Sequence, residues 1–185
     1  MQRCAWVKLS NPVYVKYHDE EWGVPVYDDR KLFEMLILEG AHAGLSWETI
    51  LMKRDTYRKA FDNFDVKKVA QYDEKKQSEL LLDLGIVRNK LKIKSSIQNA
   101  KAFLEIQKEF GSFSAYIWGM VDNKIVVNSF ENLGDYQTST PVSDKISKDL
   151  KKRGMNFVGT TIIYAFMQAV GMVNDHSKGC FLCKK

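Results

Sequence analysis

Apolar side chains recur along most of the chain at the three- and four-residue spacing that places them on one face of a helix. The clearest run opens at residues 28–31, and its shared face would hold Leu32, Phe33, Leu36, Ile37 and Gly40. The same spacing predicts helices over residues 46–61, 65–69, 73–84, 90–110, 140–154 and 159–170. Residues 119–138 are weakly patterned, and we expect a loop there despite the β-branched run at 125–127.

Local signals mark several helix ends. Ser46, Asp65 and Asp73 are typical N-cap residues, and Thr140–Pro141 with Gly154 fits a helix that has proline near its start and glycine past its end. The last predicted helix is almost wholly apolar and should lie at the centre of the core. The buried stripe of the 73–84 helix would consist of Leu80, Leu81 and Leu84. No repeat or long linker interrupts the chain, so we predict one compact all-α domain over residues 1–185.

Size and composition fit that interpretation. A chain of 185 residues can bury one core but is short for two ordinary domains. No apolar run approaches the roughly 20 residues of a membrane helix, and residues 1–6 lack the apolar stretch of a signal peptide, so we expect a cytoplasmic protein with no membrane partner. Three cysteines, Cys4, Cys180 and Cys183, are an odd set and poor material for a disulfide framework.

The net charge of +5 is concentrated in one segment. Residues 84–104 contain no acid, and their five bases equal the net charge; they are Arg88, Lys90, Lys92, Lys94 and Lys101. A localised excess of this kind favours a polyanionic partner, although a solvated helix face would show it too.

The basic segment includes a hairpin between two predicted helices. A leucine-rich helix stops at Gly85, Ile86 follows in the turn, and Arg88, Asn89 and Lys90 open the next helix. Each basic residue at a helix N-terminus costs about 0.3–1 kcal/mol because its charge opposes the helix dipole. A phosphate bound at this N-terminus would offset that cost. The pattern resembles the helix-hairpin-helix element that grips DNA backbone; the alternative is a plain helical hairpin with a solvated basic face.

The two ends of the chain hold residues that could bind a metal. Cys4, His18, His176 and Cys180 supply two thiolates and two imidazoles, enough for a closed tetrahedral zinc site joining the ends. Buried free cysteines and a capping histidine would give the same residues, and Cys183 competes with Cys180 as a ligand.

Aromatic residues surround one carboxylate near the N-terminus. Glu39 ends an apolar helical stretch, where an acid is costly to bury unless something pairs with it, and Gly40 and Gly44 let the backbone approach another body. The nearby aromatic residues are Trp6, Tyr14, Tyr17, Trp22, Tyr27 and Trp47. Aromatic walls around a buried acid suit a flat, electron-poor ligand, whereas core aromatics beside an exposed helix end would look similar.

Several ordered stretches give the chain a resemblance to a known family. They are Arg3–Trp6, Tyr17–Pro25, Leu32–Met35, Leu38–Gly40, Ala43–Trp47, Gly85–Ile86 with Arg88, Ser139–Pro141 with Ser143–Asp144, Lys151–Gly154, Phe157–Thr161 and Val173–His176. Over practically its full length the chain resembles the type I 3-methyladenine DNA glycosylases, which are helix-hairpin-helix DNA glycosylases.

The resemblance implies a fold with a helix-hairpin-helix core at about 30–153 and terminal segments 1–28 and 155–185 joined by zinc. It implies Cys4, His18, His176 and Cys180 as the ligands of one structural zinc ion, with Cys183 a bystander. It also implies a base pocket at Glu39, with Tyr14, Tyr17, Trp22 and Trp47 around it and Trp6 beside them, and a position for Leu45, next to Gly44, at the gap left in the duplex.

The implied reaction is hydrolysis of the N-glycosidic bond of 3-methyladenine in double-stranded DNA, which releases the free base. N3 methylation makes the adenine a cationic leaving group, so positioning and electrostatics can suffice. Glu39 would bind the flipped base, and Tyr17 would orient the base or the water. Three departures are Ala5, where glycine is frequent, and Ala41 and His42, where amides are expected. His42 leaves selectivity between 3-methyladenine and 3-methylguanine open.

Three other functions compete with this one. A glycosylase/lyase needs a lysine nucleophile, and Lys90 is the candidate. A non-catalytic module that binds alkylated DNA would keep the basic hairpin but lose the pocket acid, and Glu39 is present. A zinc hydrolase is disfavoured because protein would fill all four ligand positions. We expect a monomer.

Overall fold

The computed structural model describes residues 1–183, which are mostly helical, as predicted. The α-helices are α1 (Pro12–Glu20), α2 (Asp29–His42), α3 (Trp47–Met52), α4 (Arg54–Ala60), α5 (Val66–Ala70), α6 (Glu74–Leu82), α7 (Lys90–Phe110), α8 (Phe113–Gly119), α9 (Pro141–Lys152) and α10 (Thr160–Ala169). Two 3₁₀ turns, η1 (Asp62–Phe64) and η2 (Leu133–Asp135), and two short strands, β1 (Val126–Val127) and β2 (Val173–Asn174), complete the description.

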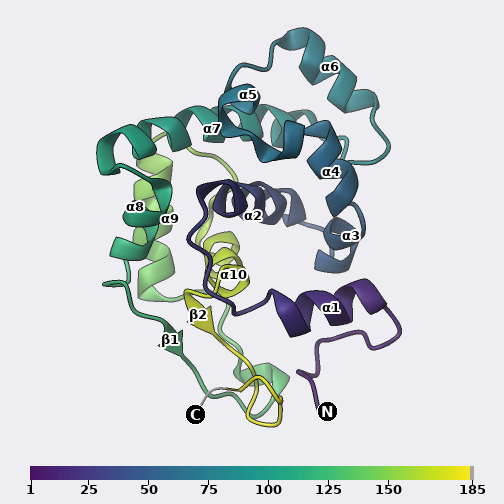
Figure 1. Cartoon of the computed structure of the whole chain (residues 1–185), viewed down its shortest axis with the longest axis vertical. Coiled ribbons are helices and arrows are strands. Elements are labelled where there is room, and N and C mark those ends of the chain that lie inside the picture. The colour runs from purple at the N-terminus through teal and green to yellow at the C-terminus, as the bar shows by residue number, and fades with distance from the viewer. Residues whose placement is uncertain (184–185) are drawn as a thin grey trace.

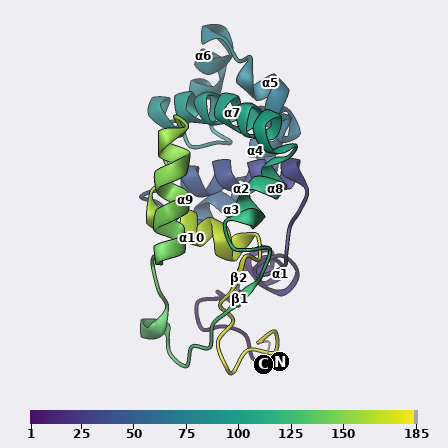
Figure 2. The ribbon, with the colours of Figure 1, turned by 90° about the vertical axis from the view of Figure 1, so that its left-hand side faces the viewer.

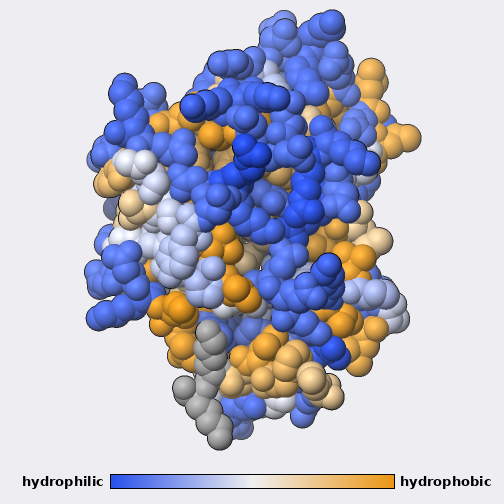
Figure 3. All heavy atoms as spheres, in the orientation of Figure 1, coloured by the Kyte–Doolittle hydropathy of each residue, from blue (hydrophilic) through white to orange (hydrophobic). Residues whose placement is uncertain are grey.

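Helices α2 and α10 form the centre of the molecule (Figure 1). The long helix α7 crosses above them with α5 and α6, while α8 and α9 close one side. The N-terminal residues and the last described residues, up to 183, lie together at the end of the molecule opposite α7, as both ribbon views show (Figure 1 and Figure 2). Hydrophilic side chains dominate the upper half of the face drawn in Figure 3, where α4 to α7 lie.

Aromatic packing joins the central helices. Phe103 of α7 stacks on Phe113 of α8 with ring centroids 4.1 Å apart, and Phe33 of α2 meets Phe103 edge-on at 5.2 Å. In α10, Ile163, Phe166 and Met167 are almost completely buried. The prediction that this apolar helix lies in the core is therefore confirmed.

Helix ends follow the local signals where these are strong. Ser46, Asp65, Asp73 and Thr140 all cap helices as predicted, because their side-chain oxygens accept hydrogen bonds from backbone N–H groups of the first turn. Helix α7 has the predicted bounds. These boundaries can be predicted from the sequence because each capping residue satisfies backbone N–H groups only two or three positions away.

Other predictions were wrong. The 46–61 segment is two helices, which break at Lys53 and so turn Arg54 into the interior. Leu84 is exposed rather than buried, because α6 ends at Leu82 and the Asp83 carboxylate accepts a hydrogen bond from the Gly85 N–H within the turn.

The structure also contains elements that the pattern did not predict. Helix α1 is capped by Asn11, and α8 by Ser112. Within the expected loop of 119–138, Val126 and Val127 pair in parallel with Val173 and Asn174. A two-residue strand is too short to show a period. None of the helices in residues 1–183 combines the length and apolarity needed to cross a bilayer.

Candidate functional site

A cavity of about 240 Å³ lies between α1, α2, α3 and α10. Its walls and floor include every predicted base-binding residue: Trp6, Tyr14, Tyr17, Trp22, Glu39 and Trp47. Tyr27 is not part of it, because that ring is mostly exposed and packs on Trp118 instead, with centroids 4.7 Å apart. The fold thus brings residues 6, 14, 17, 22, 39 and 47 to one cavity.

Four further lining residues come from segments that carried no signal in the sequence. Tyr136 and Gln137 lie in the weakly patterned segment before α9, and Ala165 and Gln168 face the cavity from α10. The packing of α10 against α2 turns Ala165 and Gln168 toward the cavity, and the fold of the chain before α9 brings Tyr136 and Gln137 to it. No local sequence pattern marks any of these four residues.

Glu39 is the acid in this cavity, and the residue is 3% exposed. It lies in the last turns of α2, three residues before His42, whose Nδ1 is 3.1 Å from a Glu39 carboxylate oxygen. Burial raises the pKa of Glu39, and the hydrogen bond and charge of His42 partly oppose that rise. The His42 ring also meets Trp47 edge-on at 5.5 Å, which fixes its position in the wall.

Tyr17 projects from α1 and is as deeply buried as Glu39. Burial and the neighbouring Glu39 charge raise the pKa of Tyr17 well above its ordinary value. The phenol is therefore neutral at physiological pH and can donate a hydrogen bond, but it is a poor base.

The remaining aromatic rings brace one another around the opening. Trp6 packs edge-on against Trp22 at 4.8 Å and lies 5.5 Å from Tyr14, while Tyr17 and Trp47 are 5.4 Å apart. The indole N–H groups of Trp6 and Trp47 are buried and have no hydrogen-bond partner among the described residues. Buried donors of this kind favour a site that receives a polar, aromatic ligand.

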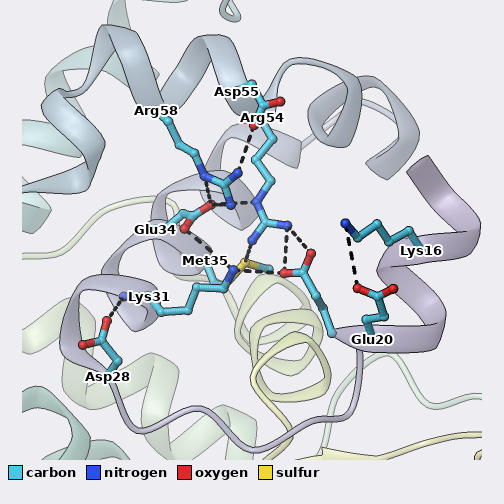
Figure 4. A network of polar contacts seen from close by, with 10 residues as sticks. Lys16, Glu20, Asp28, Lys31, Glu34, Met35, Arg54, Asp55 and Arg58 are labelled. Carbon is cyan, nitrogen blue, oxygen red and sulfur yellow. Dashed lines mark hydrogen bonds and ion pairs between the residues drawn. The ribbon is translucent and has the colours of Figure 1, made fainter. Parts of the chain in front are cut away.

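An ion-pair network joins α4 to α2 and to the end of α1 (Figure 4). Arg54, on α4, is 5% exposed; its Nε is 2.6 Å from a Glu34 carboxylate oxygen on α2, and its Nη1 is 2.9 Å from Glu21, just after α1. Arg58 and Lys31 add contacts to the same two carboxylates. The network therefore fixes α1, which carries Tyr17, against α2, which carries Glu39.

The predicted DNA-binding hairpin connects α6 to α7. Ile86 is buried, and a side chain at Gly85 would lie 2.8 Å from Thr56, so the turn packs closely on α4. Arg88 and Lys90 are exposed, and Lys90 does not line the cavity. Asn89 caps the start of α7, since its side-chain oxygen accepts hydrogen bonds from the N–H groups of residues 91 and 92.

The basic segment does not present all of its charges to solvent. Lys92 turns inward and donates hydrogen bonds to the carbonyls of Ala41 and Ala43 at the end of α2. The following turn has Gly44 at φ +78° with open space around it, and then Leu45, which is 41% exposed. Leu45 thus lies two residues before Trp47, which lines the cavity.

Three of the four predicted metal ligands form a tight buried group. The ligand atoms of Cys4, His18 and Cys180 lie within 4.8 Å of one another, and Cys180 Sγ is 3.5 Å from His18 Nε2. The His176 ring lies beside them, with its centroid 5.1 Å from that of His18. Cys183 is half-buried and outside this group.

Neighbouring residues orient the group. His18 Nδ1 is 2.7 Å from Asp19, which in turn pairs with Arg3, so Nε2 of His18 points to the thiols. Burial raises the pKa of the Cys4 thiol, but hydrogen bonds from His18 and Ser177 outweigh it and lower that pKa to about 7. Burial raises the pKa of Cys180 to about 11.

Comparisons with known proteins agree on one family. The sequence profile described as methyladenine glycosylase matches residues 6–183. DNA-3-methyladenine glycosylase 1 of Escherichia coli (strain K12) is 49% identical over 180 residues, which cover 97% of this chain and 96% of that protein.

Solved structures give the same result. A crystal structure of 3-methyladenine DNA glycosylase I superposes with a TM-score of 0.96 at 49% identity, covering 99% of this chain and 100% of that one. A variant of 3-methyladenine DNA glycosylase I in complex with 3-methyladenine superposes with a TM-score of 0.95 at 37% identity, covering 100% and 99%.

Proposed function

The chain belongs to the methyladenine glycosylase family, and on that premise we propose that it is a base-excision repair enzyme that hydrolyses the N-glycosidic bond of 3-methyladenine in double-stranded DNA. The observation that carries the proposal is a buried carboxylate, Glu39, in a cavity lined by six tryptophan and tyrosine side chains. The relatives named above are 3-methyladenine glycosylases, and one of them is known in complex with that base.

Recognition would depend on the positive charge of the damaged base. A purine methylated at N3 while still attached to deoxyribose is cationic, whereas normal adenine is neutral. The aromatic walls can attract the cation through their π faces, and Glu39 can accept its N–H hydrogen bonds. His42 assists by opposing the rise that burial causes in the pKa of Glu39.

The reaction needs little general acid or general base catalysis. Water adds to C1′ of the sugar, the bond from C1′ to the purine nitrogen breaks, its electron pair goes to the base, and the water releases a proton. Because the leaving group starts as a cation, positioning and electrostatic stabilisation of the departing base supply the catalysis. Neutral Tyr17 would donate a hydrogen bond that orients the base or the water.

The base must leave the helix to reach Glu39. We assign α6, the 83–89 turn and α7 as a helix-hairpin-helix element. Exposed Arg88 and Lys90 would contact the DNA backbone, while Gly85 and buried Ile86 would shape the turn and Asn89 caps the start of α7. Leu45, exposed after Gly44, would occupy the gap left by the base. An exposed Lys90 outside the cavity favours phosphate contact over a lyase reaction.

We also propose a structural zinc ion bound by Cys4, His18, His176 and Cys180. Bond lengths of 2.3 Å to sulfur and 2.0–2.1 Å to nitrogen give a tetrahedral site with sulfur and nitrogen about 3.6 Å apart. The 3.5 Å between Cys180 Sγ and His18 Nε2 fits that edge. With four protein ligands the ion would close the fold and leave no position for a reactive water.

Release of the free base tests the proposed activity. Duplex DNA methylated to contain 3-methyladenine should release that base when incubated with the protein, as detected by chromatography. A protein that binds the alkylated duplex but releases no base would instead be a non-catalytic binding module, the second candidate.

A further inference from the structure

The inward-pointing lysine of the basic segment connects the DNA-contacting hairpin to the base pocket. Lys92 Nζ lies 2.8 Å from the carbonyl oxygen of Ala41 and 2.7 Å from that of Ala43. Its side chain is half-buried, and burial lowers the pKa of Lys92. This lysine is therefore not available to a phosphate in the way Arg88 and Lys90 are.

The two carbonyls belong to the C-terminal turn of α2. The last carbonyls of a helix have no partners within the helix and carry the negative end of its dipole, so a cation is favoured there. Other carbonyls of this turn accept backbone hydrogen bonds, that of His42 from the Leu45 N–H at 2.8 Å and that of Gly40 from the Ala43 N–H at 3.4 Å. Lys92, on α7, thus supplies hydrogen-bond donors to carbonyls at the C-terminal end of α2.

The pocket depends on this same turn. Glu39 precedes the two capped carbonyls, His42 lies between them, and Gly44 and Leu45 follow directly. A shift of the turn would therefore move the acid of the cavity and the exposed leucine together.

The other end of the connection is equally fixed. Lys92 lies in the first turn of α7, where its own N–H donates to the Asn89 side chain and its carbonyl accepts from Ser95 and Ser96. The hairpin that ends at Asn89 is held through buried Ile86. A positive charge in the first turn opposes the dipole of α7, and the carbonyls of α2 explain why one is present at residue 92.

We infer that Lys92 is a positioning residue that fixes the end of α2 to the hairpin, so that docking of the DNA backbone places the damaged nucleotide at a set distance from Glu39. The inference rests on the proposed glycosylase activity. Lys92 touches neither the base nor the reacting atoms; it acts through the turn that carries them.

The test is the Lys92→Met variant, which keeps an unbranched stem of about the same length but removes the ammonium group with its charge and donors. Single-turnover release of 3-methyladenine is measured at increasing enzyme concentration, below the unfolding temperature of the variant. We expect the rate at saturating enzyme to fall about 10- to 100-fold, in line with misplacement of a catalytic group by about 1 Å, with the half-saturating concentration changed less than threefold. Lys108→Met, the same substitution at an exposed position of α7, is the control and should behave like the original protein.

A saturating rate within twofold of the original protein would overturn the inference. So would a defect that disappears at saturating enzyme, because that is the behaviour of a phosphate contact. Should Lys92→Met fail to fold, Lys92→Gln keeps a polar side chain that is uncharged and one atom shorter than lysine, so it should show the same loss of rate at saturating enzyme. A rate within twofold for that variant would overturn the inference as well. If the unmodified protein releases no base in the same assay, it is the proposed function that fails.

Discussion

Glu39 offers the sharpest test of how the pocket works. Replacing it by glutamine preserves the shape of the side chain and one acceptor oxygen but removes the negative charge. The His42 Nδ1 now 3.1 Å from the carboxylate would face a neutral amide, and the cavity would hold no anion to meet a cationic base.

The magnitude follows from the burial of the carboxylate. A hydrogen bond to a charged group contributes about 1.5–3 kcal/mol, against about 0.5–1.5 kcal/mol for a neutral pair. The attraction between unit charges 4 Å apart is about 4 kcal/mol at the effective dielectric constant of 20 that suits such sites, before desolvation is subtracted. Together these estimates give a net loss of about 2–4 kcal/mol in transition-state stabilisation, or about 30- to 1,000-fold in kcat/KM.

The pH dependence of the rate supplies a second measurement. Because burial raises the pKa of Glu39, the ionised form is lost at a higher pH than in a free glutamate. If the ionised form binds the base, single-turnover excision should decline as the pH falls through this raised value, and the Glu39→Gln variant should lack that decline. Rates on a duplex containing 3-methyladenine, measured from about pH 4.5 to 8 near the ordinary glutamate pKa and above it, give the profile.

Glu48→Gln is the matched control. It removes the same charge from a half-buried carboxylate that pairs with Lys8 and does not line the cavity, and its excision rate should stay within twofold. An excision rate for Glu39→Gln within threefold of the original protein, with the acidic decline intact, would refute the role assigned to Glu39.

Three further predictions follow from the contacts around the site. Arg54→Met should lower the free energy of unfolding in urea by about 3 kcal/mol, because it leaves buried Glu34 with fewer partners, whereas Lys16→Met on the exposed face of α1 should change it by less than about 0.5 kcal/mol; equal effects would contradict the assigned network. Metal analysis should find about one zinc ion per chain in the purified protein, far less in Cys4→Ala and an unchanged content in Cys183→Ala, and a zinc content insensitive to Cys4 would rule out the proposed ligands. Arg88→Gln should reduce by about 1 the slope of log K against log salt for binding to undamaged duplex, and an unchanged slope would place Arg88 away from phosphate.

The sequence alone determined most of the helices. Helix α2 begins where predicted, and α7, α9 and α10 follow their predicted ranges closely, because apolar periodicity and capping residues act over a few positions of the chain. The motif around Glu39 and the aromatic residues near the N-terminus also indicated which side chains could line a pocket. The charge pattern marked residues 84–104, but it could not separate outward-facing Arg88 from inward-facing Lys92.

How these parts meet depends on contacts between segments that are far apart in the sequence. The break at Lys53 and the exposure of Leu84 depend on which residues pack against them. A leucine in the sequence does not show whether its turn is buried or faces solvent. Gln168 reaches the cavity, and Cys4 reaches Cys180, through contacts between segments far apart in the chain. The partners of Lys92 are backbone carbonyls, which every residue possesses, so no residue pattern could have revealed them.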